Sequence, residues 1–107
     1  MEPYTEIRPS ELKQRLDAGE PPEILDVREP WEHELCAIPG ARLIPMDQLV
    51  ARVGELDSER EVVVYCHHGQ RSAAVVHWLR RQGIPAVNLR GGIDGWAVEV
   101  DPALSRY

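Results

Sequence analysis

Residues 61–72 read EVVVYCHHGQRS. The three valines and the tyrosine in 61–65 predict a strand that is buried on both faces, as strands in the middle of a parallel sheet are. Cys66 follows directly, and after a short loop residues 72–82 carry the apolar spacing of a helix that stops at Gly83. A buried strand, a tight loop and a helix in this order predict one βα unit of an open parallel sheet.

The segments on either side repeat this alternation of strand and helix. Short apolar runs predict strands at 5–8, 23–27, 41–44 and 86–89. Apolar residues three and four positions apart, between proline and glycine breaks, predict helices at 9–18, 29–35, 45–56 and 93–97. The predicted fold class is α/β, a five-stranded, mostly parallel sheet flanked by helices on both faces. At 107 residues we expect a single domain over 1–107, with its core at about 17–100.

Composition argues against several classes of function. The 12 Lys and Arg residues stand against 18 Asp and Glu, and this net charge of −6 disfavours a general nucleic-acid binder, which needs a basic surface. No apolar run is long enough to cross a membrane, and the first residues lack the features of a signal peptide. Two cysteines are too few for a disulfide scaffold. We therefore expect a cytoplasmic protein that binds neither nucleic acid nor membrane and holds any anionic substrate at a local positive site.

Cys66 is the residue most clearly suited to take part in a reaction. Ligands of open parallel sheets bind at the C-terminal ends of the strands, where Cys66 is expected to lie. Backbone N–H groups of the loop, the dipole of the following helix and the charge of Arg71 would all stabilise a thiolate there. Gly69 permits a close backbone approach and Ser72 can cap the helix. A partly exposed thiol of lowered pKa would be a nucleophile, whereas the alternative is an inert core cysteine; the loop context favours the nucleophile.

Four blocks of sequence resemble the rhodanese family of sulfurtransferases in its small single-domain form. They are ILDVRE with WE at 24–29 and 31–32, IPGA at 38–41, CHHGQRS at 66–72, and LRGGI at 89–93 with Trp96. The resemblance covers nearly the whole chain and implies a five-stranded rhodanese-like sheet. It also implies that Cys66 is the catalytic residue, which accepts a sulfane sulfur to become a persulfide. The loop residues implied to surround that persulfide are His67, His68, Gly69, Gln70, Arg71 and Ser72.

The resemblance further implies an enzyme of the thiosulfate sulfurtransferase type. Its partners would be a small sulfur donor, such as thiosulfate or a glutathione persulfide, and a thiophilic acceptor, such as cyanide, a thiol or a protein. The alternative is a sulfur-carrier or protein-binding module that acts only with a dedicated partner protein. Cysteine-based phosphatases of related loop design have a longer loop than the four residues between Cys66 and Arg71. This smaller ring suits one extra sulfur atom and disfavours phosphatase chemistry.

Three further residues outside the Cys66 loop are candidates for a role at the predicted site. Asp26 and Arg28 end the neighbouring strand, and the resemblance implies that the acidic residue supports the catalytic loop from behind. Cys36 stands before Ile38, where the family often has Gly-His. We expect Cys36 to pack as a small hydrophobic residue; the alternative is a resolving thiol that forms a disulfide with Cys66.

The histidines carry weaker signals. His67 and His68 either contact the donor or are surface residues, and the sequence leaves both roles open. Adjacent residues cannot easily converge on one ion, so we expect no metal site at Cys66, His67 and His68. We also expect no cofactor. His33 and His77 are predicted to be isolated, solvated or partly packed helical residues.

Overall fold

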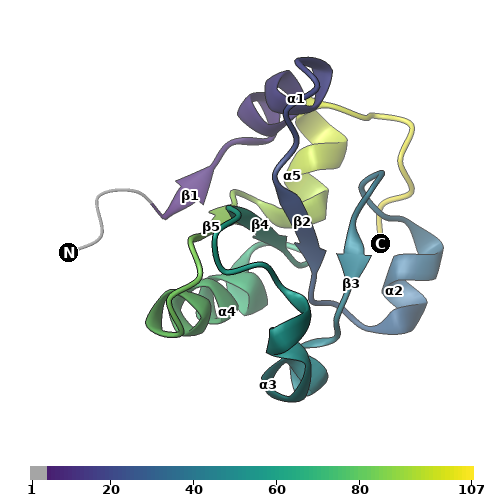
Figure 1. Ribbon diagram of the computed structural model, residues 1–107. Helices are drawn as coiled ribbons and strands as arrows, with labels where there is room; N and C mark the ends of the chain where they lie inside the picture. Colours follow the sequence, from purple (N-terminus) through teal and green to yellow (C-terminus); the bar gives the residue numbers. More distant parts are fainter. Residues whose placement is uncertain (1–4) are drawn as a thin grey trace.

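The computed structural model, described over residues 5–107, contains one five-stranded sheet between two groups of helices (Figure 1). Every strand pairing is parallel, in the order β1-β5-β4-β2-β3. The strands are β1 (Glu6–Ile7), β2 (Glu23–Asp26), β3 (Arg42–Leu43), β4 (Val62–Tyr65) and β5 (Ala86–Leu89). The helices are α1 (Pro9–Asp17), α2 (Pro30–Leu35), α3 (Leu49–Arg52), α4 (Gln70–Arg81) and α5 (Gly92–Glu99). The predicted α/β class is thus confirmed.

Strand β4 occupies the centre of the sheet, as its valines predict. All four of its residues are buried, because neighbouring strands cover both edges and helices cover both faces. Its register pairs Tyr65 with Asp26 of β2 and Val64 with Asn88 of β5. The carboxyl ends of three strands therefore meet at one edge, and Cys66 follows β4 at that edge.

Side chains along β4 alternate between two separate apolar clusters. Val62, Val64 and Cys66 join the cluster that packs against α3 and α4. Val63 and Tyr65 join the other cluster, which packs against α1 and α5. In Figure 1, α3 and α4 accordingly lie on one side of the sheet and α1 and α5 on the other. Cys66 and Tyr65 thus face opposite sides of the sheet although they are neighbours in sequence.

Two predicted helices differ from the structure. Residues 45–56 form two 3₁₀ turns, η1 (Met46–Gln48) and η2 (Val53–Glu55), on either side of the short α3. Two valines and Gly54 in this stretch have low helix propensity, so one long helix is not favoured there. Helix α4 begins at Gln70, two residues earlier than predicted, because Gly69 takes a φ of +106° and turns the chain directly into the helix. Over residues 5–107 no helix has the length and apolar character needed to span a membrane.

Candidate active site

The sulfur of Cys66 lies inside the loop that joins β4 to α4. It accepts hydrogen bonds from the backbone N–H of Gly69 at 3.1 Å, from the backbone N–H of Ser72 at 3.3 Å and from the Ser72 hydroxyl at 3.3 Å. An inert core cysteine would face apolar side chains, so this donor set favours an anionic sulfur. Cys66 is only 1% exposed, rather than partly exposed as expected, because the loop closes tightly around it.

These hydrogen bonds lower the pKa of the Cys66 thiol. Burial alone would raise the pKa, because it penalises the charged form. The Ser72 hydroxyl and the backbone N–H groups of Ser72, Gly69 and Arg71 outweigh that effect by stabilising the thiolate. The loop is therefore built to hold negative charge on the sulfur.

Two neighbouring elements hold this loop in place. They are the strand β5, through Asn88, and the start of α5, through Ile93. The side-chain amide of Asn88 donates to the carbonyl of Gly69 at 3.1 Å, and its oxygen lies 2.5 Å from the Ser72 hydroxyl. The backbone N–H of Ile93 donates to the carbonyl of Cys66 at 2.9 Å. Sequence reasoning missed Asn88, although a buried amide in the apolar strand Ala86–Leu89 is the type of residue that needs polar partners.

Arg71 forms a two-point ion pair with Glu32 of α2. Its two terminal nitrogens lie 2.9 Å and 3.0 Å from the two carboxylate oxygens, a geometry that fixes the plane of the guanidinium. Burial alone would raise the pKa of Glu32. Hydrogen bonds from Arg71, the backbone N–H of Glu29 and the Tyr107 hydroxyl instead lower it from 4.5 to about 2. The hydrogen bonds to Glu32 raise the pKa of Arg71, and the attraction of the Cys66 sulfur adds to this effect.

Asp26 and Arg28 form a fully buried ion pair behind the site. The Asp26 oxygens accept from the Arg28 side chain at 2.9 Å and 2.7 Å and from the Tyr65 hydroxyl at 3.0 Å. The prediction that His33 is isolated is wrong, because its Nδ1 lies 2.8 Å from a carboxylate oxygen of Asp26. In the described structure neither Asp26 nor Arg28 hydrogen-bonds to residues 66–72, so any influence on the loop passes through other side chains.

Tyr107 is the residue that connects this buried pair to the loop. Its hydroxyl oxygen lies 2.9 Å from the Arg28 guanidinium and 2.5 Å from Glu32. Its ring stacks on His67, with the ring centres 3.9 Å apart and the planes 7° from parallel. Burial, followed by the hydrogen bond to Glu32, raises the pKa of Tyr107 to about 12, so it stays protonated at neutral pH. Nothing in the sequence signals this contact, because 79 positions separate it from Arg28.

The loop histidines lie on the outer side of the site. His68 is 61% exposed, and its ring stacks on His67 with centres 3.9 Å apart. Asp94 comes close enough that it and the two histidines could each offer one ligand atom within 4.8 Å of the others. However, metal-binding imidazoles direct their lone pairs at the ion in the ring plane, which two stacked rings cannot both do, and Asp94 already pairs with Arg106 at 2.8 Å. Gln70 is exposed at the start of α4.

Cys36 lies outside the Cys66 loop, and its sulfur is 3.9 Å from a terminal nitrogen of the buried Arg28. It is buried in the cluster on the α1 and α5 side, whereas Cys66 belongs to the cluster on the α3 and α4 side. Both thiols are free. The carbonyl of Cys36 accepts from Arg28 at 2.6 Å. This placement favours the packing role for Cys36, because the sheet separates the two cysteines.

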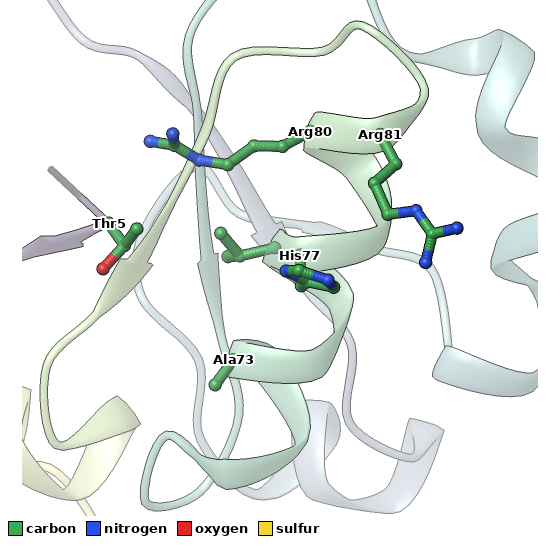
Figure 2. A pocket seen from close by; sticks show the side chains of 6 residues that line it. Thr5, Ala73, His77, Arg80 and Arg81 are labelled. Atoms are coloured by element: carbon green, nitrogen blue, oxygen red, sulfur yellow. The ribbon is translucent and has the colours of Figure 1, made fainter. Parts of the chain in front are cut away.

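The surface pocket in Figure 2 is separate from the Cys66 site. It is lined by Thr5, Ala73, Val76, His77, Arg80 and Arg81. The Arg80 side chain extends toward Thr5 and donates to the Ala86 carbonyl at 2.7 Å. The Arg81 side chain points away from Thr5. The two guanidinium groups therefore do not converge on one ligand.

The chain belongs to the family of rhodanese-like domains, whose sequence pattern it matches over residues 8–99. It is 41% identical over 93 residues to a sulfurtransferase of Allochromatium vinosum, covering 86% of this chain and 87% of that protein. A crystal structure of a rhodanese-like domain protein from Staphylococcus aureus superposes with a TM-score of 0.84 at 36% identity, covering 96% of this chain and 98% of that one.

Some relatives are much longer than this chain. It is 38% identical over 104 residues to the probable adenylyltransferase/sulfurtransferase MoeZ of Mycobacterium tuberculosis. The matched stretch covers 94% of this chain but only 26% of that protein. Other relatives are named as a putative sulfur carrier protein and a putative sulfurtransferase, both of Bacillus subtilis. A rhodanese-like domain related to sulfurtransferases and sulfur carriers is thus the class to which the fold and sequence assign the chain.

Proposed function

We propose that this protein is a sulfurtransferase that carries sulfane sulfur as a persulfide on Cys66. The observation that supports this most directly is the set of three hydrogen bonds to the Cys66 sulfur inside a loop of four residues between Cys66 and Arg71. The family membership supports the same chemistry, since relatives are named sulfurtransferases. The donor is a small compound that carries sulfane sulfur, and the acceptor is a thiophilic nucleophile.

In the first step the Cys66 thiolate attacks the outer sulfur of thiosulfate. A new S–S bond forms at Cys66, the S–S bond of thiosulfate breaks, and sulfite leaves with the electron pair. In the second step cyanide, or a thiolate, attacks the outer sulfur of the persulfide. The Cys66–sulfur bond breaks, thiocyanate or a new persulfide leaves, and the Cys66 thiolate returns without any added oxidant or reductant.

The loop supplies what this exchange needs. Its N–H donors are fixed before the reaction and stabilise negative charge on sulfur, as the donors of an oxyanion hole stabilise oxygen. Arg71 brings a permanent positive charge into the loop that surrounds the sulfur, in a chain whose net charge is −6. A dianionic donor is therefore attracted locally although the protein as a whole repels it.

The test is intact-mass measurement of the reduced protein after incubation with thiosulfate, followed by cyanide and an assay of thiocyanate. We expect wild type and Cys36→Ser to gain one sulfur atom and release it as thiocyanate. Cys66→Ser should do neither. A sulfur gain that survives in Cys66→Ser, or is lost in Cys36→Ser, would assign the wrong cysteine and refute the proposal.

The second candidate function is a sulfur carrier that delivers only to a partner protein. An apolar surface pocket favours it, since Met46, Val50 and Trp78 are among the residues that line it and apolar surface of this kind can dock a protein. A relative named as a putative sulfur carrier points the same way. A carrier would gain sulfur on Cys66 in the experiment above but would release little thiocyanate, which separates it from an enzyme.

A further inference from the structure

Residues 101–107 return from the end of α5 to the Cys66 loop. In Figure 1 this yellow segment leaves α5 and runs to the side where β3 and α2 lie. The backbone N–H of Asp101 donates to Trp96 at 3.0 Å, Leu104 packs against the core, and Arg106 binds both oxygens of Asp94 at 2.8 Å and 3.1 Å. These contacts bring Tyr107 to the loop in a defined position.

The hydrogen bonds of the Tyr107 hydroxyl have only one arrangement. A guanidinium can only donate, so the oxygen accepts from Arg28 at 2.9 Å. An ionised carboxylate can only accept, so the single proton goes to Glu32 at 2.5 Å. The hydroxyl therefore joins a buried cation to a buried anion, and each partner holds it in the orientation that suits the other.

This hydroxyl connects two ion pairs into one chain of alternating charge. Asp26 binds Arg28, Arg28 binds Tyr107, Tyr107 binds Glu32, and Glu32 binds Arg71 at both oxygens. Arg71 ends this chain inside the Cys66 loop, next to Ser72, whose backbone N–H donates to the Cys66 sulfur at 3.3 Å. Arg28 also donates directly to the backbone carbonyl of Glu32 at 3.3 Å. The Tyr107 hydroxyl is the link from Arg28 to the Glu32 carboxylate and, through it, to the guanidinium of Arg71.

The ring of Tyr107 acts on the same loop from another side. One face stacks on His67, the residue next to Cys66, and the ring forms a T-shaped contact with Trp31, with ring centres 5.7 Å apart. The carbonyl of His67 is also held by the backbone N–H of Asp94 at 3.1 Å. The ring thus orders the first loop residue while the hydroxyl orders Arg71.

We propose that Tyr107 is a positioning residue of this site, whose hydroxyl holds Arg71 where it attracts anionic reagents to Cys66. The role in catalysis rests on the proposed sulfur transfer, but the position of Arg71 can be measured without it. Iodoacetate and iodoacetamide alkylate thiolates and are similar in size, and only iodoacetate is charged. The ratio of their rates at Cys66 therefore reports the positive charge beside the sulfur and cancels changes in the thiol pKa or in loop access.

The experiment measures this ratio in a Cys36→Ser background, so that only Cys66 reacts. We expect Tyr107→Phe, which keeps the stacking ring, to lower the iodoacetate preference roughly three- to tenfold, toward the value of Arg71→Ala. Ser105→Ala, an exposed change in the same segment, should match the parent protein. The KM for thiosulfate should rise in Tyr107→Phe by a similar factor, with kcat less affected.

The outcomes separate this inference from the proposed function. A normal alkylation ratio in folded Tyr107→Phe would refute the inference even if sulfur transfer were confirmed. A loss of ratio in Tyr107→Leu but not in Tyr107→Phe would also refute it, because the ring rather than the hydroxyl would then act. A lowered ratio in Tyr107→Phe would support it even in a protein that failed to form a persulfide from thiosulfate.

Discussion

Gly92 lies so close to His67 that a β-carbon on it would stand 2.4 Å from the His67 carbonyl oxygen. The same β-carbon would be 2.6 Å from the carbonyl oxygen of Cys66. Gly92 also has a φ of +62°, in the left-handed region that side chains other than glycine's disfavour. The start of α5 is thus pressed against the backbone of the active-site loop, and hydrogen bonds from Ile93 and Asp94 to those two carbonyls hold the contact.

We expect Gly92→Ala to destabilise the protein by about 2–5 kcal/mol, since it combines backbone strain with an overpacked backbone contact. The displaced loop should also lose its alignment on the Cys66 sulfur, so the thiol pKa should rise toward its ordinary value. Urea unfolding measures the first effect, and the pH dependence of alkylation measures the second.

Two control glycines separate strain from contact. Gly83 has a φ of +84° and nothing within 4 Å of its β-carbon position, so Gly83→Ala should cost only the strain, about 1–2 kcal/mol. Gly54 has neither a positive φ nor a close neighbour, so Gly54→Ala should change stability by less than about 1 kcal/mol. Equal losses for Gly92→Ala and Gly83→Ala would contradict the close contact.

The second prediction concerns the hydroxyl group of Ser72. It carries one proton, and both the Cys66 sulfur and the Asn88 oxygen lie within its reach. A thiolate is the stronger acceptor because it is charged, so the proton stabilises the ionised form of Cys66. We expect Ser72→Ala to raise the Cys66 pKa, which moves the midpoint of iodoacetamide reactivity to higher pH. Exposed Ser58→Ala is the control, and an unshifted midpoint in Ser72→Ala would leave the backbone N–H groups as the whole cause.

Much of the fold and part of the site could be predicted from local sequence. The run of valines before Cys66 fixes a buried strand, and Gly69 fixes the turn that follows, because both act through neighbouring residues. The predicted parallel sheet follows from them, since short strands separated by helices have few other arrangements. The position of Cys66 at the strand end could therefore be inferred without the structure.

The long-range part of the site could not be predicted. Asn88, Glu32 and Tyr107 reach the loop from three other elements, and their roles depend on side-chain directions set by packing. His33 illustrates the same point, because its carboxylate partner Asp26 lies seven positions away on a different element. Local spacing carries no information about such contacts, which is why His33 was expected to be isolated.

The buried pair of Asp26 and Arg28 leads to the third prediction. Asp26→Asn leaves the Arg28 charge buried without its counterion, which should cost about 3–5 kcal/mol. The control is Asp17→Asn, which breaks the exposed pair with Lys13 one helical turn away and should cost about 0.5 kcal/mol or less. Urea unfolding of both variants measures the contrast. Similar losses in the two would mean that Arg28 finds other compensation, such as the backbone carbonyl of Cys36.

The last prediction concerns the acid stability that Glu32 confers. Its pKa is lowered from 4.5 to about 2 in the folded protein, so the folded state favours the ionised form. The resulting stabilisation, about 3 kcal/mol, is complete above about pH 5 and is lost as the pH falls toward 2, because the unfolded chain then binds a proton that the folded chain does not.

Glu32→Gln removes this contribution and leaves the other carboxylates unchanged. The difference in unfolding free energy between wild type and Glu32→Gln should therefore be constant above about pH 5 and shrink between pH 5 and about pH 2. Exposed Glu99→Gln provides the comparison, with a small and nearly constant difference from wild type over the same range. A gap for Glu32→Gln that stays constant down to about pH 2 would show that the carboxylate's ionisation is not what Arg71 and Tyr107 stabilise.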